Sequence, residues 1–120
     1  MKELVMLMQK ELEIEIRQIE IMNEYIRMID NLDISVEKSK TLKNESDNLT
    51  KELNKIKQEK KLYILKVEQS KDYCVTDIYE MSMMVENFNN IISRLNNQRN
   101  QLGAHGLELL ALKIRDINKE

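Results

Sequence analysis

The stretch IYEMSMMVENFNNIISRL, residues 78–95, carries the clearest indication of the fold class in this sequence. Its apolar side chains recur at alternating spacings of three and four residues, at Ile78, Met81, Val85, Phe88, Ile92 and Leu95. This spacing keeps an apolar stripe on one side of a helix that packs against other helices. Met83, Met84 and Ile91 widen the stripe, and a wide stripe indicates contact with more than one neighbour. We therefore predict a helix in an assembly of three or more helices here.

Earlier in the chain the same periodicity continues in other registers. One series repeats every seven residues at Val5, Leu12, Ile19 and Ile26. Its companion series is interrupted only by Glu15 and runs through Met8, Glu15, Met22, Ile29 and Val36. The phase slips between residues 36 and 42, and a new register includes Leu42, Leu49, Leu53 and Ile56. Polar residues such as Ser46 and Lys60 occupy core slots of this middle stretch, where they weaken packing but can specify register and partner.

The fold class predicted from these registers is all-α, with long heptad-repeat coiled-coil helices that assemble with partner helices. A first coiled-coil segment is expected over residues 1–70 and a second over 71–102, because the phase slips again just after Cys74. Two glycines in the sequence GAHG predict a turn at 103–106, since Gly commonly ends helices. A short third helix should then cover 107–120 and fold back or dock on a partner.

Composition agrees with long helices and excludes several functions. The 120 residues include no Pro, no Trp and two Gly, and aromatic residues make up 4%. The net charge is −2, with 19 basic residues interleaved among 21 acidic ones, so no basic face typical of nucleic-acid binding is expected. No apolar run is long enough for a membrane span or a secretory signal. We expect an intracellular protein that does not insert into membranes.

Catalysis is not expected, because the reactive residue types occur singly. His105 stands between two glycines without a second ligand or a carboxylate partner, so it is expected in a loop. Cys74 lies on the apolar stripe, where a buried, reduced thiol is the simpler interpretation. No glycine-rich phosphate loop is present, and no metal or cofactor is predicted.

A partner-binding role follows from the apolar registers. The methionines Met81, Met83 and Met84 suit either ordinary helix packing or an adaptable binding surface, since Met repacks easily. The predicted partner-binding seam comprises Leu42, Leu49, Leu53, Ile56, Ile78, Met81, Val85, Phe88, Ile92 and Leu95. A charge at Ile92 is expected to abolish complex formation.

The order of these features resembles the coiled-coil carboxy-terminal region of the 62-kilodalton nucleoporin, a central-channel family of the nuclear pore. The resemblance is spread over YIRMIDN at 25–31, the polar heptads at 37–62, and the segments MVE at 84–86 and IISRLN at 91–96. Tyr25 stands where the family tends to have Trp. The resemblance implies three helical segments joined near 67–74 and 103–106.

The same resemblance implies a function and partners. Family members assemble with two other channel nucleoporins as a heterotrimeric coiled coil that anchors the subunit and supports protein and mRNA transport. The implied location is the nuclear pore complex at the nuclear envelope. The family's Phe-Gly repeats bind transport receptors, but the only Phe here is Phe88, followed by Asn89. Direct receptor binding by this chain is therefore not expected.

Two other classes stay open at this point. A scaffold of a kinetochore, spindle or tethering complex would use the same heptad pattern. A membrane-fusion bundle is disfavoured, because no isolated Gln or Arg layer interrupts an apolar run; Arg99 lies at a core position only where the pattern fades. The identity of co-purifying partners would distinguish these classes.

Overall fold

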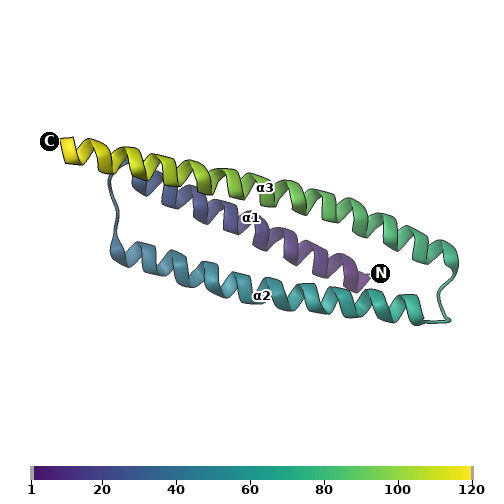
Figure 1. The fold of residues 1–120 in the computed structure, drawn as a ribbon. Helices are drawn as coiled ribbons and strands as arrows, with labels where there is room; N and C mark the ends of the chain where they lie inside the picture. Colours follow the sequence, from purple (N-terminus) through teal and green to yellow (C-terminus); the bar gives the residue numbers. More distant parts are fainter. Residues whose placement is uncertain (1, 120) are drawn as a thin grey trace.

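A computed structural model describes residues 2–119 as three long helices (Figure 1). These are α1 (Lys2–Asp30), α2 (Val36–Gln69) and α3 (Val75–Lys119). Residues 2–119 contain no strand, which confirms the all-α class. The helices lie side by side in an elongated bundle that measures 71 × 24 × 15 Å.

Helix α1 is shared between the other two helices. It packs against both α2 and α3, running antiparallel to α2 and parallel to α3 (Figure 1). Helix α1 can contact both neighbours because it has two apolar faces. Ile14, Ile21 and Met28, spaced seven residues apart, face α2, whereas Leu4 and Met8 pack with Met81 of α3. An apolar arc this wide needs two neighbours. The chain therefore buries its stripes by folding back on itself.

Three apolar clusters form the core. The one near the start of α1 joins all three helices, through Leu4, Met8, Val67 and Met81. The other two clusters lie between α1 and α2, around Leu53 and around Leu42. Further along α1, α3 is brought close by small residues instead of by a large apolar cluster. The two outer helices consequently share an apolar core only near the loop that joins them.

The first loop, at 31–35, interrupts the segment that was expected to run from 1 to 70. Leu32 has a positive φ of 53°, and its N–H donates to the carbonyl of Ile29. The N–H of Asp33 donates to the carbonyl of Met28 at 3.0 Å, which completes a Schellman-type helix end. Ser35 then caps α2 by accepting a hydrogen bond from the N–H of Lys38. The chain reverses here without glycine or proline.

The second loop, at 70–74, lies where the second phase slip occurs. The N–H of Ser70 donates to the carbonyl of Val67 and closes α2. Cys74 precedes α3, and its thiol donates to Oδ2 of Asp77 over 3.0 Å. The prediction of a buried thiol is wrong: Cys74 is exposed, because the apolar stripe of α3 begins only at Ile78.

The predicted turn at 103–106 and separate helix at 107–120 are not observed within the described residues. α3 continues through both glycines to Lys119, and neither glycine has a positive φ. A Cβ at Gly106 would lie 3.4 Å from Cγ1 of Ile26, and one at Gly103 would lie 3.7 Å from Cε of Met22. The glycines thus allow α3 to approach α1 closely. His105 is accordingly an exposed helical residue and not a loop residue.

Candidate helix-binding surface

The ten residues of the predicted partner-binding seam lie inside the chain's own bundle. Five are buried, namely Leu42, Leu53, Ile56, Met81 and Ile92. The other five are half-buried, namely Leu49, Ile78, Val85, Phe88 and Leu95. Eight of the ten pack in or against the three clusters described above, and Ile92 and Leu95 lie outside them. A surface open to a partner must therefore lie elsewhere on the molecule.

Two ion pairs with buried carboxylates hold the helices in register. Nζ of Lys60 lies 3.0 Å from Oε1 of Glu11, which is 1% exposed, and also 4.8 Å from the centroid of the Phe88 ring. The single Lys60 side chain thereby contacts α1 and α3 at once. Nη1 of Arg99 lies 3.6 Å from Oε2 of Glu15, an oxygen that accepts no hydrogen bond. Charged groups in a core tolerate little sliding, because displacement would leave them buried and unpaired.

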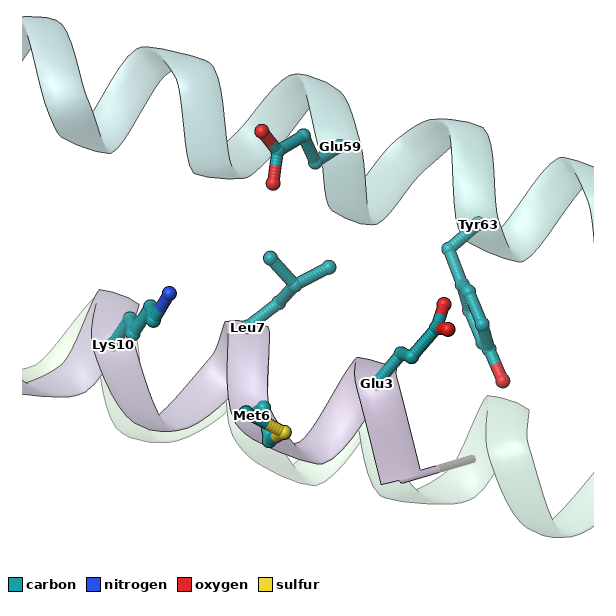
Figure 2. A pocket seen from close by; sticks show the side chains of 6 residues that line it. All are labelled: Glu3, Met6, Leu7, Lys10, Glu59 and Tyr63. Atoms are coloured by element: carbon teal, nitrogen blue, oxygen red, sulfur yellow. The ribbon is translucent and has the colours of Figure 1, made fainter.

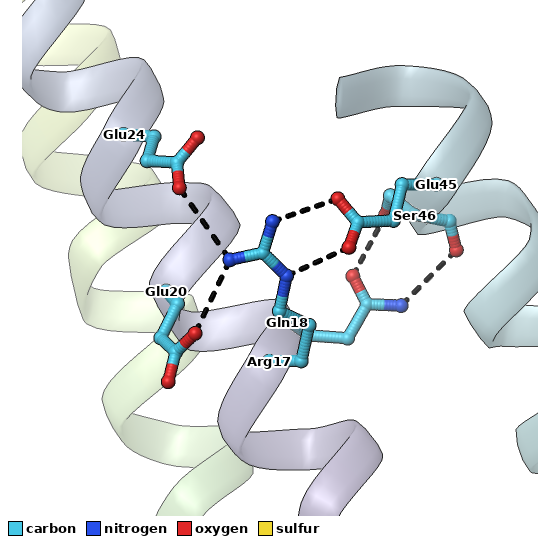
Figure 3. Close-up of polar contacts among 6 residues, drawn as sticks. All are labelled: Arg17, Gln18, Glu20, Glu24, Glu45 and Ser46. Carbon is cyan, nitrogen blue, oxygen red and sulfur yellow. Dashed lines mark hydrogen bonds and ion pairs between the residues drawn. The ribbon is translucent and has the colours of Figure 1, made fainter. Parts of the chain in front are cut away.

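A polar network ties α1 to α2 on the side away from α3 (Figure 3). Arg17 donates two hydrogen bonds to the carboxylate of Glu45, at 2.7 and 2.8 Å, and also contacts Glu20 and Glu24. These bonds lower the pKa of Glu45 below its ordinary value and raise that of Arg17. The neighbouring Gln18 exchanges hydrogen bonds with Ser46, so a polar core slot of the sequence is satisfied within the chain.

An open apolar groove lies between α1 and α3. We name it the methionine groove, and its lining residues are Met8, Tyr79, Glu80, Met83, Met84, Asn87, Phe88 and Ile91. Met83 is 41% exposed and Ile91 is 46% exposed, whereas Met81 lies on the other side of the helix and is buried. On α1, Val5 and Ile16 share the face of Met8 and are also exposed. The groove thus presents flexible apolar side chains from two parallel helices.

A smaller pocket lies between the start of α1 and the end of α2 (Figure 2). It has a volume of about 310 Å³, and Met6, Leu7 and Tyr63 form its apolar part. Glu3, Lys10 and Glu59 add charges of both signs to its lining. Because little apolar surface is available between the charges, this pocket suits a partner helix less well than the methionine groove does.

The part of the chain that the structure describes contains no group of three His, Cys, Asp or Glu residues placed to hold a metal ion. Within residues 2–119, no helix combines the length and hydrophobicity needed to cross a membrane. Comparisons of the chain with protein-family models, curated proteins and solved structures found no match.

Sequence reasoning located part of the methionine groove and missed the rest. The residues that widen the stripe, Met83, Met84 and Ile91, are the ones that line the groove from α3. Val5 was assigned to a core series although it is exposed, because a heptad series does not tell which face of a helix a neighbour covers. The exposed face of α1 is defined only once α2 and α3 are in place.

Proposed function

We propose that this protein is a non-catalytic structural subunit that joins a larger assembly by accepting a partner helix in the methionine groove. The observation that best supports this function is that Met83 and Ile91 are exposed beside the half-buried Met84 and Phe88. Neighbouring apolar residues exposed on one side of a monomer are typical of interaction sites. Methionine adapts to the shape of the incoming side chains.

The partner should be an amphipathic helix with an apolar stripe at spacings of three and four. Such a helix can lie along the groove and bury Ile91 together with Val5 and Ile16. Backbone groups of a helix are already hydrogen-bonded internally, so this contact needs only apolar side chains and a polar rim. Glu80 and Asn87, which also line the groove, supply polar groups at its edge.

More specifically, we propose that the subunit lies in the central channel of the nuclear pore, where it is an anchor that binds two other coiled-coil nucleoporins. We call this the nuclear-pore form of the proposal. The sequence resemblance supports this form, and the folded-back bundle modifies it: the partners would pack on the outside of a preformed three-helix unit. Transport receptors would bind elsewhere in the assembly. A scaffold of another intracellular complex is the alternative form, and it shares the same groove.

The test is co-purification of the full chain with candidate channel nucleoporins after co-expression. We expect Ile91→Asp to lower partner recovery at least roughly tenfold, because a charge would be buried against the partner helix. The matched control is Leu62→Asp, since Leu62 is 64% exposed on α2, away from the groove. Both variants should keep wild-type helicity.

Two outcomes would count against the proposal. Equal recovery of the wild type and Ile91→Asp would place the contact on another surface. In the second outcome, the wild type binds no channel nucleoporin but captures components of a kinetochore, spindle or tethering complex through Ile91. This result would exclude the nuclear-pore form and retain the helix-binding role.

A further inference from the structure

The bundle has one open end, where α3 runs past the end of α1. Nζ of Lys113 lies 4.0 Å from Oδ1 of Asp30, the last residue of α1. Because α1 and α3 are parallel, residues 114–119 of α3 extend beyond this level, as the yellow end of the ribbon shows (Figure 1). The first loop, at 31–35, lies at the same end of the molecule.

The last turns of α3, from Leu107 onward, carry an apolar stripe that is mostly exposed. Leu107, Leu110, Ile114 and Ile117 follow one another at spacings of three, four and three residues, so they share one face of the helix. Leu107 is 71% exposed, Ile114 is 51% exposed and Ile117 is 56% exposed. Further back on α3 the same spacing carries the residues that α1 and α2 cover.

The loop contributes a second exposed apolar group at this end. Leu32, Ile34 and Val36 are 55%, 54% and 70% exposed. If a fully exposed aliphatic residue offers about 175 Å², these three residues and the three exposed residues of the tail present roughly 600 Å² per molecule. A pair of molecules would then bury about 1,200 Å², which is the lower bound for a stable interface. The open end is therefore large enough for a dimer contact.

We infer that the occupant of this open end is a second copy of the same chain, bound through a twofold axis with the two α3 tails antiparallel. Each tail would lie along the tail of the other copy, with its tip beside the other copy's first loop. Charges favour this arrangement, because Asp33 is the single charged residue of the loop, whereas residues 114–119 carry Arg115 and Lys119 against the single acid Asp116.

This inference uses a surface distinct from the methionine groove, which lies near the other end of α3. It goes beyond the proposed function, and either can fail without the other. A dimer of this kind would present two methionine grooves pointing away from its centre. One homodimer could then hold two partner helices, with the gain in avidity that paired sites give.

Sedimentation equilibrium of the full chain tests the inference. The wild type should approach twice its 14.3 kDa mass as concentration rises. Ile117→Asp should raise the dissociation constant by roughly a hundredfold, since a charge in an apolar contact is poorly tolerated. Leu112→Asp is the matched control: Leu112 is 50% exposed on the same helix, but its spacing places it on the opposite face.

The inference is supported if the wild type and Leu112→Asp form dimers and Ile117→Asp does not. A wild type that remains at 14.3 kDa overturns it. Equal weakening by both charges, or by neither, also overturns it, because the contact would not be on the stripe. Circular dichroism of each variant checks that the helices are intact, and Ile117 is exposed, so its replacement leaves the core unchanged.

Discussion

At the scale of single residues, the buried charges of α1 distinguish this bundle from an apolar one. Glu11 and Glu15 occupy core positions and are each 1% exposed. Each carboxylate faces a cation from a different helix, Lys60 on α2 and Arg99 on α3. Such pairs add little net stability compared with apolar residues, but they make wrong registers costly. We interpret them as the residues that fix α1 between its two neighbours.

This interpretation predicts the effect of breaking the Lys60 pair. Lys60→Met should lower the free energy of unfolding by about 3–5 kcal/mol, because it leaves the buried Glu11 without a cation. Adding Glu11→Met should recover most of that loss, since two apolar residues can pack where the pair stood. Urea denaturation followed by circular dichroism measures both. A double variant as unstable as the single one would contradict the assignment of the pair.

The neighbours Ile91 and Ile92 show what sequence reasoning could not separate at this scale. Both belong to the widened stripe, and a charge at Ile92 is the test that the heptad pattern suggests. In the structure Ile92 is 7% exposed and Ile91 is 46% exposed. A charge at Ile92 would disrupt the fold itself, so only Ile91 distinguishes partner binding from stability.

At the scale of elements, α3 differs most from its sequence-based prediction. The pair of glycines was expected to end a helix, because Gly accepts the left-handed conformation. Both glycines instead face Met22 and Ile26 of α1 and allow close contact between helices. Sequence alone does not distinguish these roles, since each needs only a missing side chain.

A substitution at Gly103 distinguishes the two roles. Gly103→Ala should raise the free energy of unfolding by about 0.5–1 kcal/mol, because Ala favours the helix and its Cβ has ordinary space beside Met22. At a helix end with positive φ, the same change would be destabilising. Thermal and urea denaturation give the sign. A clear loss of stability would contradict a continuous α3.

The two loops were unequally predictable for a physical reason. The break at 70–74 left a phase slip in the apolar pattern, because the stripe has to restart after the loop. The break at 31–35 reverses the chain through Leu32, a residue type that seldom adopts a positive φ. The only trace in the sequence is the phase slip that follows, at 36–42. Helix content was thus predictable, whereas the position of this reversal was not.

At the scale of the whole molecule, the sequence predicted apolar stripes but not their neighbours. An apolar stripe indicates that a helix packs against a neighbour, but it does not indicate whether that neighbour belongs to the same chain or to another. The structure covers the seam residues with the chain's own helices, because α1 has apolar faces toward both α2 and α3. The methionine groove and the open end are among the apolar surfaces that stay exposed, and these are the two to which we assign binding.

The central claim is that the isolated chain folds back into a three-helix unit with its seam covered. Small-angle X-ray scattering at a concentration where the mass is that of one chain tests this directly. For the folded-back bundle we expect a longest dimension close to its 71 Å length and a radius of gyration near 19.5 Å. A continuous helix over residues 5–102 would be about 145 Å long. A single-chain particle of that length would contradict the folded-back bundle.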